Sequence, residues 1–277
     1  MLVVDSIQQM KLISREWDTK LSIGFVPTMG ALHSGHLDLV KQSKKQNDIT
    51  VVSIFVNPSQ FGENEDFDKY PSTFESDSTH LKALDVDYIF LPNKRSIYPE
   101  GYKTWVEVAD LTNKLCGKSR PTHFKGVTTI VLKLVNIVQP TNMYMGEKDF
   151  QQVVVLERML TDLNLDTLIK RCAIVRNHDG LALSSRNRYL SQEERVVAPE
   201  LQKAMQKFRQ KFLEGESNLT TLVTSFKETL TNFGFIIDYI EVVDSISLVS
   251  KKSLVNGDRL IVAVFLGATR LIDNIEI

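Results

Sequence analysis

Short runs of apolar residues alternate with longer amphipathic segments through the first 175 residues of the chain. The runs are apolar throughout and rich in β-branched residues, which is typical of strands buried on both faces of a sheet. The segments between them carry apolar residues at three- and four-residue spacing, as helices packed on a sheet do. The expected strands are 21–26, 49–56, 86–91, 142–145 and 168–175, and the expected helices are 37–46, 73–84, 127–138 and 150–163. This alternation predicts a doubly wound, Rossmann-like α/β domain with a parallel sheet.

The composition of the sequence and the order of its expected elements change after residue 175. A loop rich in Asn, Asp, Gly and Ser comes first, and it is followed by two long polar helices and three strands. These elements are expected at 176–188 for the loop, 192–214 and 217–232 for the helices, and 235–243, 259–265 and 271–277 for the strands. A length of 277 residues also exceeds the usual size of one domain. We therefore predict a domain over 1–175 and a smaller α+β domain over 176–277 that forms a lid over the active site.

The charge and composition of the chain exclude several classes of partner. A formal net charge of -1 gives no field that would attract a nucleic acid. The apolar stretch 130–138 is interrupted by Lys133 and Asn136 and is shorter than the roughly 20 residues that span a bilayer. The two cysteines lack metal-type spacing, and residues 1–9 do not resemble a signal peptide. We expect a cytoplasmic protein with small-molecule partners, no nucleic acid and no membrane segment.

One segment at the end of a predicted strand carries the strongest chemical signal. Residues 27–36 read Pro-Thr-Met-Gly-Ala-Leu-His-Ser-Gly-His and lead directly into a helix. Gly30 and Gly35 let the backbone turn and approach a ligand, and the helix start offers free N–H groups to an anion. His33 and His36 are three residues apart and can face the same phosphate, where imidazoles stabilise developing charge. The plainer alternative is that both histidines cap the helix and face solvent.

Other phosphate-binding signatures are missing from the sequence. The tripeptide Gly117-Lys118-Ser119 lacks the upstream glycine of a P-loop, because position 112 is Thr, and no Gly-x-Gly-x-x-Gly occurs. A P-loop kinase and a dinucleotide-dependent dehydrogenase are therefore disfavoured.

Further motifs follow the histidine segment in a fixed order. They are Phe-Val-Asn-Pro-Ser-Gln-Phe at 55–61, Tyr-Pro at 70–71, Arg-Pro-Thr-His-Phe-Lys-Gly at 120–126, Gly-Glu-Lys-Asp-Phe-Gln-Gln at 146–152, Asp-Gly-Leu-Ala-Leu-Ser-Ser-Arg-Asn at 179–187 and Leu-Gly-Ala-Thr-Arg-Leu-Ile-Asp-Asn at 266–274. The His-x-Gly-His pattern is similar to the signature of the nucleotidylyltransferase superfamily. Together the motifs resemble the pantothenate synthetase family over nearly the full length of the chain.

The resemblance implies a reaction and its partners. It implies condensation of pantoate with β-alanine through a pantoyl adenylate, with ATP and Mg²⁺ as cofactors and with release of pyrophosphate and AMP. It also implies a homodimer. Two other functions stay open: a nucleotidylyltransferase that stops after transferring the nucleotidyl group, and a non-catalytic nucleotide-binding module. The presence of the histidines, Lys148 and the Ser-Ser-Arg tripeptide together favours catalysis over the module.

The resemblance also implies roles for individual residues. The catalytic residues are His33, His36, Lys148 and Arg186. The expected ATP-binding residues are Pro27, Met29, Gly35, His36, Gly146, Lys148, Asp149, Ser184, Ser185 and Arg186, the expected pantoate-binding residues are Met29, Asn57, Gln60 and Gln152, and the expected Mg²⁺ ligand is Asp77. Amides suit pantoate because they hydrogen-bond a hydroxyl and a carboxylate without adding charge. Hydroxyls and a guanidinium suit phosphates because they donate charge-assisted hydrogen bonds.

The chain departs from the family pattern at a few positions. Ser76 stands where relatives often have a second acid, so the metal shell expected around Asp77 is smaller. Cys116, Thr122 and Leu183 also replace the family's common residues. Arg120 is expected either as a polar contact near the site or as a structural salt bridge. His80, His123 and His178 are expected to be surface or packing residues.

Overall fold

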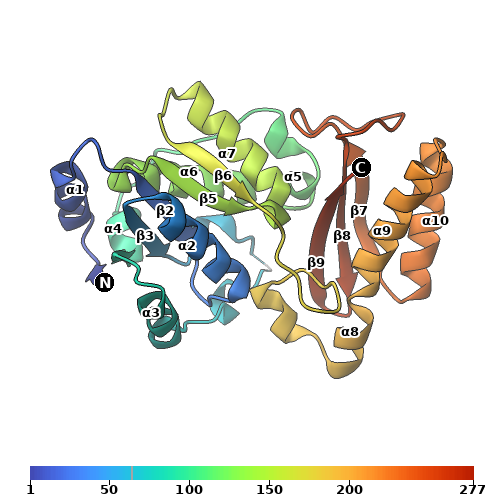
Figure 1. Cartoon of the computed structure of the whole chain (residues 1–277), viewed down its shortest axis with the longest axis horizontal. Helices are drawn as coiled ribbons and strands as arrows, with labels where there is room; N and C mark the ends of the chain where they lie inside the picture. The colour runs from blue at the N-terminus through green and yellow to red at the C-terminus, as the bar shows by residue number, and fades with distance from the viewer. Residues whose placement is uncertain (64) are drawn as a thin grey trace.

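The chain builds two β-sheets that lie side by side (Figure 1). A computed structural model describes residues 1–63 and 65–277. The larger sheet has six strands in the order β1-β4-β3-β2-β5-β6, and all neighbouring strands run parallel. The strands are β1 (Leu2–Val4), β2 (Ile23–Thr28), β3 (Ile49–Ile54), β4 (Tyr88–Phe90), β5 (Asn142–Gly146) and β6 (Leu168–Cys172). The predicted parallel sheet is confirmed, and the edge strand β1 is an addition to the prediction.

The strand order reverses between β2 and β5. Strand β2 is followed in the chain by β3 on one side of it, whereas β5 on its other side comes only after β4. Open α/β sheets bind ligands at such a switch point, beyond the carboxyl ends of the strands. The residues after β2 and β5 are therefore the ones that the fold presents to a ligand.

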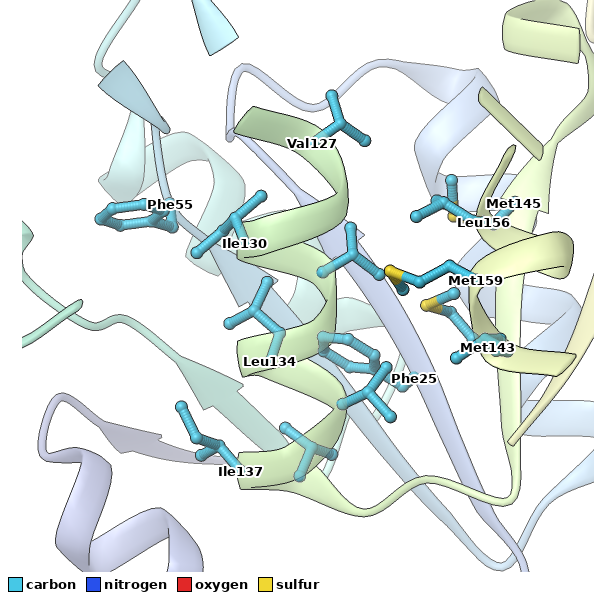
Figure 2. Close-up of a cluster of buried hydrophobic side chains, with 14 of the residues drawn as sticks. Phe25, Phe55, Val127, Ile130, Leu134, Ile137, Met143, Met145, Leu156 and Met159 are labelled. Carbon is cyan, nitrogen blue, oxygen red and sulfur yellow. The ribbon is translucent and has the colours of Figure 1, made fainter. Parts of the chain in front are cut away.

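Helices cover both faces of the parallel sheet (Figure 1). Helices α2 (Ser34–Gln46) and α3 (Phe74–Ala83) pack on one face, and α1 (Ile7–Glu16), α6 (His123–Val138) and α7 (Phe150–Asp162) pack on the other. Figure 2 shows the core on the face covered by α1, α6 and α7, where apolar side chains of α6 meet those of β5 and α7. Helix α6 starts four residues before its predicted beginning, and α1 was not predicted.

The second sheet is antiparallel, and two long helices pack against it. Strands β7 (Ile236–Val243), β8 (Arg259–Leu266) and β9 (Thr269–Glu276) pair in that order. Helices α9 (Glu200–Leu213) and α10 (Leu219–Asn232) share a buried core with them. The single helix predicted over 192–214 is wrong, because the chain forms α8 (Gln192–Val197) and α9 separated by Ala198 and Pro199. Pro199 has no backbone N–H, so the helical hydrogen-bond ladder is interrupted there.

A buried apolar cluster joins the two parts of the chain. Leu115, Phe150 and Val154 of the first part pack with Val243 and Ile261 of the antiparallel sheet. In Figure 1 this sheet lies between the α9–α10 pair and the parallel-sheet part. The predicted boundary at 175/176 falls between β6 and β7. The antiparallel sheet is thus anchored to the first part by a shared core, and its role as a lid stays a prediction.

The remaining elements are short. They are α4 (Lys94–Ile97), α5 (Cys116–Ser119), η1 (Pro58–Gln60), η2 (Phe67–Lys69), η3 (Leu111–Asn113), η4 (Glu147–Asp149) and η5 (Ser185–Tyr189). Within residues 1–63 and 65–277, no helix has both the length and the apolar character needed to cross a bilayer.

Candidate active site

The turn after β2 is held in place by hydrogen bonds to the side chains of Thr28 and Asp77. The hydroxyl of Thr28 accepts a hydrogen bond from Gly30 N at 3.1 Å and donates to the carbonyl of Ser53 in the neighbouring strand at 2.8 Å. The carboxylate of Asp77 in α3 accepts from Ala31 N at 2.9 Å and from Leu32 N at 2.8 Å. These bonds fix the path by which the chain reaches His33.

The structure gives Asp77 a different set of contacts from those expected of a metal ligand. Its side chain is buried, with 2% exposure, and Thr73 Oγ1 donates to it at 3.1 Å in addition to the two backbone N–H groups. Both carboxylate oxygens are engaged in this way. In the described part of the chain, no group of three or more His, Cys, Asp or Glu side chains is placed to hold a metal ion. The geometry therefore shows that Asp77 holds the turn, and its predicted Mg²⁺ contact stays a prediction.

The two histidines cap helix α2 and share one orientation. His33 Nδ1 accepts a hydrogen bond from Gly35 N at 3.2 Å, and His36 Nδ1 accepts from His33 N at 3.4 Å. The ring centroids are 4.0 Å apart. A ring nitrogen that accepts carries no proton, so in the neutral form the proton of each ring lies on Nε2. The cap thus leaves two Nε2–H donors. The plainer alternative expected a helix cap, which both histidines form, but their side chains are partly buried rather than fully in solvent.

Burial keeps both imidazoles neutral. Burial, followed by the positive charge of Lys148, lowers the pKa of His33 from 6.5 to about 4. Burial and the neighbouring His33 lower the pKa of His36 to about 3. At neutral pH each ring therefore acts as a hydrogen-bond donor without a full charge.

Gly35 is required by the position of the His33 ring. A Cβ built at residue 35 would lie 2.9 Å from Cε1 and 3.0 Å from Nδ1 of that ring. The same Cβ would lie 3.8 Å from the Cβ of Leu183, which places the loop before the Ser-Ser-Arg tripeptide directly beside the helix start. At Gly146, by contrast, a Cβ meets nothing within 4 Å and the backbone is extended, so packing does not explain that glycine.

The turn after β5 brings charged groups to the histidines. Lys148 and Asp149 lie in η4, which follows β5 and leads into α7. The charges of both residues act on the pKa of His33 and on that of His36. The predicted group of His33, His36, Lys148 and Asp149 is thus brought together at the switch point of the sheet. Lys148 is partly buried and Asp149 is exposed, and the roles predicted for them stay predictions.

The amides expected to bind pantoate follow β3. Asn57 is 1% exposed, and its Nδ2 donates to Gln60 Oε1 at 3.0 Å and to the carbonyl of Gly126 at 3.1 Å. The Nε2 of Gln60 lies 3.3 Å from the sulfur of Met29. A thioether is a weak acceptor, so this contact leaves the Gln60 amide able to donate to a stronger one. Met29, Asn57 and Gln60 are therefore brought together with a fixed amide orientation.

Gln152, which was predicted to bind pantoate, and Pro27, which was predicted to bind ATP, are less constrained. Gln152 lies in the first turn of α7 and is partly buried, and within residues 1–63 and 65–277 its side chain forms no hydrogen bond. Pro27 lies in β2 and is partly buried. The structure places both near the carboxyl edge of the sheet and does not test their roles.

His123 and Arg120 both contact the backbone carbonyl oxygen of Gln60 and so hold its turn in place. His123 Nδ1 lies 2.9 Å from the Gln60 carbonyl oxygen, and Arg120 Nη2 donates to the same oxygen at 3.2 Å. Arg120 also forms a bidentate ion pair with Glu65. The salt-bridge interpretation of Arg120 is thus the one that the structure supports. His123 is a packing residue, and sequence reasoning missed its contact with the Gln60 turn.

The Ser-Ser-Arg tripeptide starts the short helix η5. Ser184 Oγ accepts from Arg186 N at 3.2 Å and caps this helix. The Arg186 guanidinium donates to both carboxylate oxygens of Asp66 at 2.8 and 3.0 Å, and burial raises the pKa of Tyr70. The predicted phosphate-binding arginine is therefore paired with an acidic residue of the 65–70 segment. No sequence signal had pointed to Asp66.

A family model described as Pantoate-beta-alanine ligase matches residues 2–276 of the chain. A curated protein named pantothenate synthetase from Thermosipho africanus (strain TCF52B) is 50% identical over 278 residues, and the match covers 100% of both chains. The crystal structure of pantothenate synthetase from Thermus thermophilus is similar with a TM-score of 0.94 and 41% identity, covering 100% of this chain and 99% of that one. A pantoate-beta-alanine ligase from Francisella tularensis, crystallised with beta-gamma ATP and β-alanine, gives a TM-score of 0.82 and 38% identity, with 100% and 97% covered.

Proposed function

The chain belongs to the pantoate-β-alanine ligase family, and from that premise we propose how its residues carry out the reaction. The reaction is the ATP-dependent ligation of pantoate and β-alanine. The observation that supports our assignment of roles is the meeting of two neutral imidazoles with Lys148 at the switch point of the sheet.

In the first half-reaction, a pantoate carboxylate oxygen attacks the α-phosphorus of ATP. The bond from that phosphorus to the bridging oxygen breaks, and pyrophosphate leaves with the electron pair. The Nε2–H groups of His33 and His36 and the ammonium of Lys148 stabilise the negative charge that builds up on the phosphate oxygens. Neutral donors suit this task because they need not change protonation state between substrate and product. No protein nucleophile takes part.

Pantoate is held by the amide side chains of the turn that follows β3. The Gln60 amide donates to the pantoate oxygens, and Asn57 keeps it in the orientation that allows this. Met29 supplies an apolar contact for the substrate's methyl groups. Gln152, in the first turn of α7, completes the polar contacts. Holding the carboxylate at a fixed distance from the phosphate contributes to the rate by orientation.

In the second half-reaction, the β-alanine amine attacks the acyl carbon of the adenylate. The bond between that carbon and the AMP oxygen breaks, AMP leaves with the electron pair, and the proton lost by the nitrogen passes to the phosphate of the departing AMP. Loop 184–186 binds phosphate through Ser184, Ser185 and Arg186, and it keeps water from the adenylate. Arg186 reaches the phosphates once its ion pair with Asp66 opens.

Mg²⁺ is proposed to enter the site bound to the phosphates of ATP, where it supplies charge neutralisation. Mg²⁺ keeps several waters and needs few protein carboxylates. Asp77 is the carboxylate that the family resemblance suggests for the metal, and it already accepts hydrogen bonds from Ala31 N and Leu32 N.

A homodimer in the cytoplasm is proposed from the family resemblance. The edge strand β1 supports an interface through the N-terminal domain, because Met1, Leu2 and Val3 are between 42% and 49% exposed there. Cys116 and Cys172 are free thiols, which fits a reducing compartment. Light scattering during size exclusion, with and without a charged residue at Leu2, measures the oligomeric state.

Product analysis by mass spectrometry tests the reaction sequence. The enzyme is incubated with ATP, Mg²⁺, pantoate and β-alanine, and each is omitted in turn. We expect pantothenate and AMP only in the complete mixture, and a bound pantoyl adenylate with pyrophosphate when β-alanine is left out. A stable, released nucleotidyl product formed without the amine would instead indicate a nucleotidylyltransferase that stops after the first transfer.

The roles of the histidines are tested by a substitution that preserves the helix cap. Asn is a favoured N-cap residue, so His33→Asn keeps a side-chain acceptor for α2 and removes the Nε2–H donor. We expect pyrophosphate release to fall by about 10²-fold, as for loss of one oxyanion donor, with little change in melting temperature. Wild-type turnover in this variant would refute the assignment of His33.

A further inference from the structure

Two adjacent residues of β9 each contact a different loop of the active site. Asp273 and Asn274 are both 2% exposed, and they end the sequence motif at 266–274, for which the reaction gives no role. Asn274 reaches the turn that carries Lys148, and Asp273 reaches the base of the loop that carries Arg186. Both of these loops belong to the phosphate site proposed above.

Asn274 binds the Lys148 turn through its amide. Its Nδ2 donates to the carbonyl of Glu147 at 2.8 Å and to the carbonyl of Lys148 at 3.1 Å. Its Oδ1 accepts from Arg259 Nη1 at 2.7 Å. A guanidinium can only donate, so this bond fixes which end of the amide faces the turn.

Arg259 is itself held between the two parts of the chain. Its guanidinium carbon lies 4.1 Å from the centre of the Phe150 ring, and its Nη2 lies 3.5 Å from a carboxylate oxygen of Glu147. Phe150 is the first residue of α7 and directly follows the Lys148 turn. The Arg259 guanidinium is therefore fixed by these contacts, and it in turn fixes the amide of Asn274 that binds the Lys148 turn.

Asp273 binds the base of the other loop. Arg176 donates to both of its carboxylate oxygens, at 2.6 and 2.9 Å, and also donates to the Gly180 carbonyl at 3.2 Å. Arg176 and Ala182 form an isolated antiparallel bridge, which closes the hairpin that immediately precedes Ser184. The direction in which the Ser-Ser-Arg tripeptide leaves this hairpin thus depends on Asp273.

We propose that Asp273 and Asn274 are positioning residues that set the spacing between Lys148 and the loop 184–186. Because the two residues are neighbours in one strand, a single rigid element holds both phosphate-binding loops in register. The C-terminal domain is therefore required for the adenylation half-reaction, in addition to any covering role. This inference rests on the proposed function, in which Lys148 and Arg186 bind the phosphates of ATP.

The inference makes the two half-reactions separable. Pyrophosphate release needs Lys148 and the loop at the correct distance, and an error of about 1 Å in such a site costs about 10²-fold in rate. Attack of β-alanine on a supplied pantoyl adenylate has no pyrophosphate to stabilise. It needs loop 184–186 only to cover the adenylate and is therefore less sensitive to the distance between this loop and Lys148. A variant that only destabilises the fold would slow both steps alike.

The experiment compares Asn274→Ala and Arg176→Gln with Asp258→Asn in the full-length enzyme. Asp258 is also 2% exposed, and its side chain binds Val255 N at 2.9 Å and Lys251 at 3.3 Å rather than either loop, so it is a matched control for stability. Pyrophosphate release is measured with ATP and pantoate, and the second step with synthetic pantoyl adenylate and β-alanine. Melting temperatures are recorded for every variant.

We expect kcat/KM for pyrophosphate release to fall about 10- to 100-fold in Asn274→Ala, with a raised KM for ATP, while the second step stays within about threefold of wild type. Arg176→Gln should show the same split. Rates in either variant that match Asp258→Asn, or equal losses in both steps, would overturn the inference. If Asn274→Ala does not fold, Arg176→Gln, whose side chain is 22% exposed, decides alone. Wild-type enzyme that releases no pyrophosphate from ATP and pantoate would refute the proposed function instead.

Discussion

Replacing Asp77 by Asn distinguishes a turn-holding residue from a metal ligand. In the structure the carboxylate accepts two backbone N–H bonds, from Ala31 at 2.9 Å and from Leu32 at 2.8 Å, and it is 2% exposed. An Asn side chain has one acceptor oxygen, so its NH₂ group must face one of the two donors. One backbone N–H of the turn then stays buried without a partner.

The cost follows from these contacts. A buried unsatisfied donor costs about 1–3 kcal/mol, and the remaining bond loses the extra strength that a charged acceptor gives. We therefore expect the free energy of unfolding to fall by about 3 kcal/mol, which lowers the melting temperature by roughly 6–12 °C. Because the turn leads to His33, pyrophosphate release should fall as well.

The assay pairs thermal unfolding with a Mg²⁺ titration of pyrophosphate release. Glu75→Gln is the control, because it removes the same charge from the first turn of the same helix α3 at an exposed position. We expect Asp77→Asn to melt well below this control and to need the same Mg²⁺ concentration for half-maximal rate. Removing a group that matters for metal affinity typically costs about tenfold in affinity. An unchanged melting temperature together with a roughly tenfold higher Mg²⁺ requirement would therefore refute the reasoning. Asp77 would then be a metal ligand.

Three further changes test other parts of the site. The pKa values of His33 and His36 lie below the value near 6.5 of the unfolded chain, so the unfolded state binds more protons in acid. Their contribution to the free energy of unfolding is complete above pH 6.5. It is lost as the pH falls toward about 4 for His33 and about 3 for His36. Melting temperature should therefore fall less steeply with acid in His33→Asn than in wild type, and a parallel slope would contradict the burial of a neutral ring. Asp66→Asn releases Arg186 from a partly exposed ion pair worth up to about 1 kcal/mol, so the KM for ATP should fall by up to about fivefold; an increase would show that the pair helps binding. In Gly126→Ala the new Cβ would overlap the backbone of the Gln60 turn, which must move; we expect the KM for pantoate to rise by about tenfold or more while that for ATP stays constant, and equal changes in both would indicate general unfolding.

Most of the elements of the parallel sheet were predictable because their patterns are local. Buried strands and amphipathic helices show their periodicity within about ten residues, and the doubly wound arrangement follows from their alternation. The exceptions are short or interrupted elements. Strand β1 has three residues, too few for a periodic pattern, and Pro199 divides what reads as one long helix.

The histidine and lysine part of the site was predictable for a related reason. His33 and Lys148 directly follow parallel strands, and the ends of such strands meet at one edge of the sheet. The contacts that the prediction missed are those made by side chains of distant elements. The pairing of Arg186 with Asp66 joins residues 120 positions apart, and no spacing in the sequence indicates it.

The sequence by itself determined the alternation of strands and helices, the place of the phosphate-binding residues at the strand ends and the family to which these motifs belong. Only the tertiary structure decided that Asp77 is turned toward Ala31, that both imidazoles are partly buried with lowered pKa values, and that Asn274 holds the backbone of Lys148, 126 residues away. The physical reason is that backbone propensity and hydrophobic periodicity act between near neighbours in the chain. The partner of a buried polar group, in contrast, is set by which elements pack against each other, because burial forces each donor and acceptor to find whatever partner the packing supplies.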